Sequence, residues 1–212
     1  MNKIRTILLA LLLSVATTPL MADFTGPYVG ISLNASGAEF DGRHTDEDGS
    51  LTKGHAGIFF TMAGLDAGWT FGLGDSFGIS LGLTNMGGSG EIKADDAANG
   101  ADVTLKIEGP RTVYISPTIA VGDSSAIYLK FGKSTADLSA TGDVTGAPND
   151  LDGRTYAVGT QSLFPSGMFI QTEAGVTDYD KMTISGIGGS SSATVKASPQ
   201  VAYGAVTVGI KF

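Results

Sequence analysis

The sequence predicts an all-β fold, an eight-stranded antiparallel transmembrane β-barrel that is closed and up-and-down, with short turns on one rim and four long loops on the other. The first observation is the closing stretch, residues 201–212, in which apolar side chains alternate with small or polar ones. One face carries Phe212, Ile210, Val208 and Val206, and the other carries Lys211, Gly209, Thr207 and Ala205. The second is an export signal at the start, and the third is the even spacing of tight turns.

Residues 1–22 read as a secretory signal peptide. Lys3 and Arg5 supply a positive start, residues 7–16 are apolar, and a small or turn-prone stretch leads to a cut between Ala22 and Asp23. The apolar run is too short to cross a bilayer as a helix. We therefore expect a mature chain of residues 23–212 that forms one β-barrel domain and has no transmembrane helix.

The amino-acid composition narrows the class of protein further. The chain has no Cys, 31 Gly, only 7 Pro and a charged share of 16%. An exported chain without disulfides is held by backbone pairing and packing alone. The formal net charge is −8, which makes nucleic acid a poor partner.

Eight stretches of the chain alternate apolar and polar residues. They are residues 28–40, 55–72, 77–84, 103–121, 127–132, 154–164, 168–177 and 201–212. Tight turns at 74–76, 122–125 and 165–167 join successive strands, and polar loops are expected at 41–54, 87–102, from 133 to about 152, and at 183–192. Pro117 cannot donate a ladder hydrogen bond and predicts a local irregularity. The sheet is expected to close into a barrel, because an open sheet edge in the hydrocarbon layer would leave backbone N–H and C=O groups unpaired.

Aromatic residues gather near the rim of short turns. They are Phe24, Tyr28, Trp69, Phe71, Phe77, Phe164 and Phe212. This clustering indicates an interfacial girdle. The alternative, a secreted sandwich or lipocalin-like barrel, would put the apolar residues inside, whereas the opposite face is rich in Gly, Ala, Ser and Thr, which suit a narrow packed lumen.

The signal peptide, the mature start at residues 25–31 and the closing strand with its terminal Phe resemble the eight-stranded OmpA-like and opacity-type outer-membrane proteins of Gram-negative bacteria. The resemblance implies a bacterial outer-membrane location, a monomer surrounded by outer-membrane lipid and lipopolysaccharide, and insertion by the outer-membrane assembly machinery. It also implies a C-terminal assembly signal carried by Tyr203, Val206, Val208, Ile210 and Phe212. The sequence departs from OmpA in ending at the barrel, so we expect no peptidoglycan-binding domain.

No catalytic residue, metal site or cofactor is predicted. The only histidines, His44 and His55, lie in or beside the first long loop, and a hydrolase would need a nucleophile with a base in reach. Residues 46–49 and 149–153 resemble fragments of calcium loops, but neither continues to a Glu at the twelfth position.

Three charged residues share the polar face of their strands: Asp66, Lys130 and Glu173. They lie at similar distances from their nearest short turns, so we expect similar depths in the barrel. Eight strands enclose a space that side chains just fill. We therefore predict an ionic plug around Lys130, with Glu173 as first partner and Asp66 as second; the alternative is that each faces a separate water pocket.

The predicted function is a structural or surface-interaction role for a barrel with a narrow plugged lumen. The alternatives are a small-solute porin or ion channel and, from another class, a lipid A-modifying outer-membrane enzyme.

Overall fold

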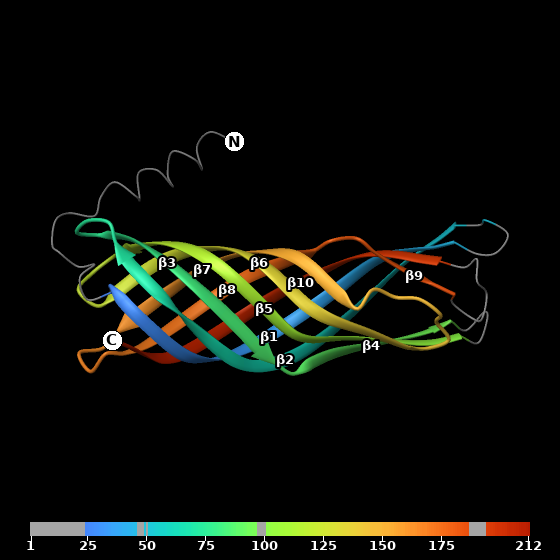
Figure 1. Ribbon diagram of the computed structural model, residues 1–212, viewed down its shortest axis with the longest axis horizontal. Helices are drawn as coiled ribbons and strands as arrows, with labels where there is room; N and C mark the ends of the chain where they lie inside the picture. Colours follow the sequence, from blue (N-terminus) through green and yellow to red (C-terminus); the bar gives the residue numbers. More distant parts are fainter. Residues whose placement is uncertain (1–23, 46–48, 50, 97–100, 187–193) are drawn as a thin grey trace, which may run out of the picture.

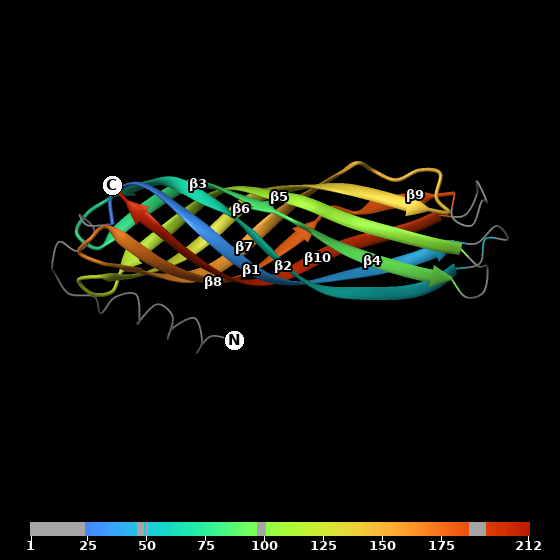
Figure 2. The same ribbon diagram turned by 90° about the horizontal axis from the view of Figure 1, so that it is seen from below.

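The structure, a computed structural model, describes residues 24–45, 49, 51–96, 101–186 and 194–212. Its strands are β1 (Gly26–Thr45), β2 (Leu51–Gly72), β3 (Phe77–Gly87), β4 (Ser89–Asp96), β5 (Ala101–Ala120), β6 (Ser125–Gly142), β7 (Asp150–Leu163), β8 (Met168–Tyr179), β9 (Met182–Ser185) and β10 (Thr194–Lys211). They form one barrel in the order β1-β2-β3-β5-β6-β7-β8-β10, and β10 pairs back to β1 (Figures 1 and 2). β4 extends the wall of β3 and pairs with β5, while β9 extends that of β8 and pairs with β10. The predicted closed eight-stranded antiparallel barrel is confirmed.

The three predicted tight turns lie on one rim. Gly74, Gly122 and Gly167 have φ values of 136°, 149° and 81°, a backbone conformation that glycine adopts without strain. The two ends of the described chain meet on the same rim, where the amide of Phe212 donates to the carbonyl of Pro27 at 2.9 Å. The long hairpins extend from the opposite rim (Figure 1).

The strands run much farther into the predicted loops than the sequence suggested. β1 and β2 stay paired out to Thr45 and Leu51, inside the expected loop 41–54. β4 and the start of β5 occupy much of 87–102, β6 and β7 extend into 133–152, and β9 lies at the start of 183–192. The predicted loop boundaries are therefore wrong, because Asp and Gly in these stretches sit on paired strands.

The register tilts the strands around the barrel axis. Directly opposed residues, followed from Ala67 on β2 through β3, β5, β6, β7, β8, β10 and β1, return to β2 at Gly57, ten positions away. Such a stagger requires strands that are inclined to the barrel axis, and Figure 1 shows this inclination.

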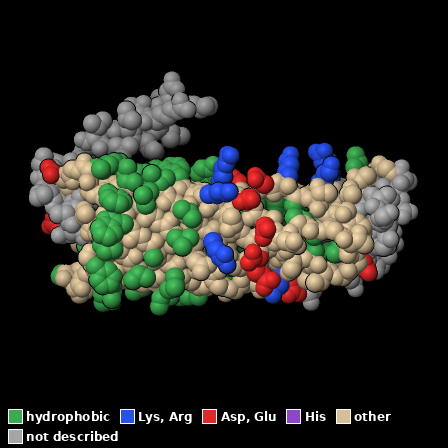
Figure 3. Space-filling view, viewed as in Figure 1, with side chains coloured by type: hydrophobic (Ala, Val, Ile, Leu, Met, Phe, Trp, Pro, Cys, Tyr) green, Lys and Arg blue, Asp and Glu red, His purple; other side chains and the backbone are tan. Residues whose placement is uncertain are grey.

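An apolar band covers the outside of the half near the short turns. Figure 3 shows many of the hydrophobic side chains concentrated there and most of the visible charged ones beyond them. Exposed members include Val29, Ile31, Leu33, Leu65, Leu81, Leu83, Val113, Ile115, Leu129, Phe131, Val158, Ile170, Val206, Val208 and Ile210. A band of this kind flanked by polar surface is the lipid-facing zone of a transmembrane barrel.

The other half of the barrel has the opposite polarity, which the sequence analysis missed. Along β1, Val29, Ile31 and Leu33 point outward, whereas Ala38 and Phe40 point inward. The inner cluster of this outer half contains Ala38, Phe40, Ile107, Ala136, Leu138, Leu151, Tyr179, Met182, Ile184, Ala197 and Val201. The outer half is therefore built like a barrel in water, with a dry core inside and polar residues outside.

Irregularities interrupt β5 at two places. Pairing with β6 lapses at Ser116 and Pro117 without a register shift, in line with the irregularity predicted at Pro117, and the Ser116 hydroxyl donates to the carbonyl of Leu129 at 2.8 Å. A register shift that was not predicted lies between Glu108 and Arg111. There Gly109 has a φ of 53°, so the wall bends where the two halves join.

The aromatic girdle is only partly as predicted. Trp69, Phe71, Phe77, Phe164 and Phe212 are exposed on the outer surface. The prediction is wrong for Phe24 and Tyr28, because their side chains are only 0% and 7% exposed and lie inside the barrel.

The predicted signal peptide, residues 1–22, lies outside the described residues, as does Asp23. In the described part of the chain no helix is long and apolar enough to span a membrane.

Candidate functional site in the barrel lumen

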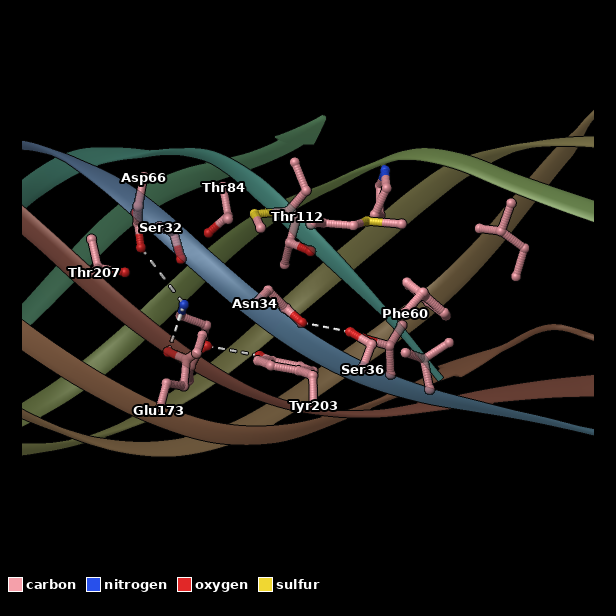
Figure 4. A pocket seen from close by; sticks show the side chains of 18 of the residues that line it. Ser32, Asn34, Ser36, Phe60, Asp66, Thr84, Thr112, Glu173, Tyr203 and Thr207 are labelled. Atoms are coloured by element: carbon pink, nitrogen blue, oxygen red, sulfur yellow. Dashed lines mark hydrogen bonds and ion pairs between the residues drawn. The ribbon is translucent and has the colours of Figure 1, made fainter. Parts of the chain in front are cut away.

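The structure places Asp66, Lys130 and Glu173 together inside the barrel. Lys130 Nζ lies 2.6 Å from Glu173 Oε2 and 3.9 Å from Asp66 Oδ2, and the three side chains are only 4–6% exposed. They come from β6, β8 and β2, three different walls of the lumen. Figure 4 draws both ion pairs. One buried ammonium group therefore faces two carboxylates, with Glu173 much the closer.

Three tyrosines donate hydrogen bonds to these carboxylates, and a fourth bonds to one of the three. Tyr128 and Tyr203 donate to the two oxygens of Glu173 at 2.8 and 2.7 Å. Tyr114 donates to Asp66 Oδ1 at 2.6 Å and shares a 2.6 Å hydrogen bond with the hydroxyl of Tyr28. A buried charge is tolerated when it is both paired and hydrogen-bonded.

The ring of Tyr114 also faces the cation, since Lys130 Nζ lies 4.3 Å from the ring centroid. This distance is within the range of a cation–π interaction. We call Asp66, Lys130, Glu173 and the tyrosines Tyr28, Tyr114, Tyr128 and Tyr203 the lumen cluster. None of the four tyrosines was predicted as a member, and Tyr203 was instead assigned to the assembly signal. Their place on the polar face of alternating strands indicates that they point into the lumen.

Each of these tyrosines lies directly opposite a glycine on a neighbouring strand. The pairs are Tyr28 with Gly68, Tyr114 with Gly82, Tyr128 with Gly159, and Tyr203 with Gly175. A Cβ atom added to Gly175 would lie 2.7 Å from the hydroxyl oxygen of Tyr203. The glycines therefore provide the space in which the rings lie against the wall of the lumen.

Side chains also fill the lumen on the short-turn side of the cluster. Lys211 Nζ donates to Thr70 Oγ1 at 3.0 Å, and Thr70 shares a 2.9 Å hydrogen bond with Ser80. Nearer the rim, Phe24 packs with Ala120 and Ala126, all at most 1% exposed. This end of the lumen is closed by apolar contacts.

A small cavity of about 70 Å³ adjoins the lumen cluster. Its lining includes Lys130 and Glu173, hydroxyl groups such as Ser32 and Thr84, and Phe60 and Val201 from the dry core or its edge (Figure 4). The cavity has room for a few water molecules. Polar groups at one end and apolar ones at the other make it a pocket between two packed layers.

The sequence matches the model of the outer membrane protein beta-barrel domain over residues 7–210. The chain belongs to this family. A search of curated proteins found no significant match.

The chain is similar to solved outer-membrane barrels. OprG from Pseudomonas aeruginosa aligns with a TM-score of 0.59 and 15% identity over 89% of this chain and 96% of its own. Ail of Yersinia pestis aligns with a TM-score of 0.49 and 12% identity over 89% of this chain and 99% of its own. The OprG likeness at this identity shows the fold, and with the family match it places the protein in the bacterial outer membrane.

The proposed assembly residues of this outer-membrane barrel do not share one face. Val206, Val208 and Ile210 are 45–47% exposed on the lipid-facing side of β10, and Phe212 is 73% exposed. Tyr203 instead points into the lumen and donates to Glu173. The role of the five residues in assembly stays a prediction.

The remaining sequence candidates of the barrel lie in its outer half. Residues 150–153 open β7 and pair with β6 or β8, so this stretch is a paired strand and not an open loop. Within the described residues, no group of three or more His, Asp or Glu side chains could hold a metal ion. The side chain of His55 and most of the segment 46–49 lie outside the described part.

Proposed function

We propose that this outer-membrane protein is a sealed barrel with a structural and surface-interaction role. The observation that carries the proposal is the occupation of the lumen at three successive levels. They are the apolar contacts around Phe24, the lumen cluster around Lys130, and the dry core around Phe40 and Leu138. A solute would have to displace all three layers, and close-packed interiors resist such displacement.

The outer half supports the surface part of the proposal. Paired strands carry this half well past the apolar band, and its apolar core excludes water from within. A wall held by ladders and a packed core is a rigid support for binding surfaces. The protein would stand as a monomer among outer-membrane lipid and lipopolysaccharide, inserted by the assembly machinery.

The alternatives from other classes require features of a different kind. A small-solute channel needs a continuous aqueous path, which barrels of 16 to 18 strands provide because of their larger diameter. A lipid A-modifying enzyme needs a nucleophile and a base within hydrogen-bonding reach on the outer wall. The structural role is supported by contacts among the described residues. It needs neither an aqueous path nor a pair of catalytic groups.

A liposome-swelling assay tests the proposal. Proteoliposomes that contain the refolded barrel would be diluted into isotonic amino acids and sugars of increasing size. We expect swelling no faster than that of protein-free liposomes for every solute, while a general porin reconstituted in parallel swells readily. Entry of the smaller solutes at a rate proportional to the amount of barrel would contradict the proposal and favour the channel.

A further inference from the structure

Polar side chains from several walls of the barrel meet beside Lys130 in the middle of the lumen. Asp66 on β2 lies directly opposite Thr84 on β3, and Ser32 on β1 lies directly opposite Thr207 on β10. These four residues and Lys130 all line the cavity of about 70 Å³. Figure 4 shows the side-chain oxygens of the four turned toward one region next to the ion pairs. The cavity therefore has one end at which a ligand would meet oxygen atoms and an ammonium group together.

Hydrogen bonding at this end of the cavity is incomplete within the described part of the chain. Tyr114 donates to Asp66 Oδ1, whereas Asp66 Oδ2 lies 3.9 Å from Lys130 Nζ, which is beyond hydrogen-bonding distance. The buried hydroxyl oxygen of Thr84 has no hydrogen-bond partner among the described residues. An ammonium group has three protons to donate, and one of them is used by Glu173 Oε2 at 2.6 Å. Buried polar atoms in native proteins are almost always hydrogen-bonded, so these groups require a further partner.

Water meets this requirement better than a metal ion or an apolar molecule does. A metal ion between Lys130 and Asp66 would be repelled by the ammonium group, and an apolar molecule would leave the carboxylate oxygen unpaired. A water molecule both accepts and donates, and polar contacts longer than about 3.5 Å are often bridged by one. The cavity exceeds the 10 to 15 Å³, roughly, that one water molecule needs.

We propose that a water molecule held by Lys130, Asp66 and Thr84 bridges the second ion pair of the lumen cluster. It accepts a hydrogen bond from Lys130 Nζ, donates one to Asp66 Oδ2 and forms another with the Thr84 hydroxyl. Asp66 is then fully hydrogen-bonded without moving closer to the ammonium group. The bound water is thus a structural part of the middle layer of the lumen. The inference goes beyond the sealed-barrel function and does not depend on it, because a leaking barrel could hold the same water.

Thermal unfolding of Thr84→Val tests the proposal, because the sign of the effect depends on the water. Valine keeps the shape of the side chain and removes the hydroxyl. If the water is bound, the variant loses one of its hydrogen bonds, and we expect the midpoint of the refolded barrel in micelles to fall by about 2 to 6 °C. An unchanged or higher midpoint would overturn the proposal, since removing a buried hydroxyl without a partner costs nothing.

Thr112→Val is the matched reference in the same cavity lining. The Thr112 hydroxyl shares a direct 2.7 Å hydrogen bond with Ser134, so this variant should lower the midpoint whether or not the water is bound. Its shift shows how the assay responds to the loss of one hydroxyl inside the lumen.

A crystal structure of the unmutated barrel locates the water directly. We expect a density peak about 2.7 to 3.2 Å from both Lys130 Nζ and Asp66 Oδ2, and equal thermal stability in sodium chloride and in choline chloride of the same concentration. Direct contact of the two charged groups with no peak between them would overturn the proposal. Stabilisation by sodium alone would overturn it as well, because the occupant would then be a cation. The swelling assay reports the seal separately, so a sealed barrel without this water contradicts only the present proposal.

Discussion

Lys130 supplies the positive charge of the lumen cluster. Its ammonium group lies within 4 Å of carboxylate oxygens of both Glu173 and Asp66. Replacing it with alanine would leave two carboxylates facing each other in a space with little water. Removing one partner of a buried ion pair is strongly destabilising because the remaining charge is uncompensated.

We expect Lys130→Ala to lower the free energy of unfolding by about 3 to 5 kcal/mol. Lys133→Ala is the matched control three positions along β6, where the side chain is 74% exposed and pairs with Asp152; its effect should stay within about 1 kcal/mol. Thermal unfolding in detergent micelles, followed by circular dichroism and by gel mobility without boiling, measures both. Equal stabilities of the two variants would show that the ion pair adds nothing to the fold.

The glycines opposite the tyrosines give a second prediction at this scale. Gly175→Ala should destabilise the barrel by about 1 to 3 kcal/mol, because overpacking displaces side chains and the new methyl group would lie 2.7 Å from both Tyr203 and the Cβ of Ala157. Gly204→Ala is its control, since a Cβ there meets nothing within 4 Å. The same thermal unfolding measurements compare the stabilities of these two variants. A Gly204→Ala variant as unstable as Gly175→Ala would assign the cost to strand backbone and not to the ring.

Strand parity was enough to place the ionic residues in the lumen, and it could also have placed the tyrosines there, but it could not assign the hydrogen-bond partner of each tyrosine. Strand parity and distance from a short turn fix the direction and depth of Asp66, Lys130 and Glu173, and a narrow barrel then brings equal depths together. Which hydroxyl reaches which oxygen depends on the register between strands. That register places Tyr128 and Tyr203 on either side of Glu173, and no local pattern specifies it.

At the scale of the element, β1 shows how one strand serves two environments. Its first half faces apolar side chains outward, and its second half turns Ala38 and Phe40 inward while Glu39 and Asp41 face water. The frequency of Asp and Gly in residues 41–54 is typical of a loop, which is why a loop was predicted there. The parity of the apolar residues changes near Ser36, and this change is the signal that would have extended the strand.

The outer half and the membrane half of the barrel should therefore unfold separately. Phe40 is 5% exposed in the dry core, and the cavity that Phe40→Ala creates should lower the free energy of unfolding by about 3 to 5 kcal/mol. We expect that cost to appear as easier opening of the outer half, seen as faster protease cleavage within the long hairpins. The membrane half keeps its own lipid-facing band and lumen cluster, so the folded, unboiled form should still migrate as a barrel in gels. Loss of that form together with the outer half would show a single cooperative unit.

At the scale of the whole molecule, alternation, tight turns and the need to close the sheet were enough to predict the fold class. They did not predict the length of the walls, because paired strands outside the membrane need no apolar outer face. They also missed that the lumen is filled by three layers of different chemistry. Those layers depend on contacts between walls far apart in sequence, such as Phe24 with Ala120 and Ala126.

The sealed lumen is the central claim, and single-channel recording in planar lipid bilayers tests it most directly. The refolded, unmutated barrel should give no steady conductance at either sign of the applied voltage, because the lumen cluster and the two apolar layers leave no continuous water path. Lys130→Ala, which loosens the middle layer, should raise any residual ion leak. A large and steady conductance from the unmutated protein would contradict the account.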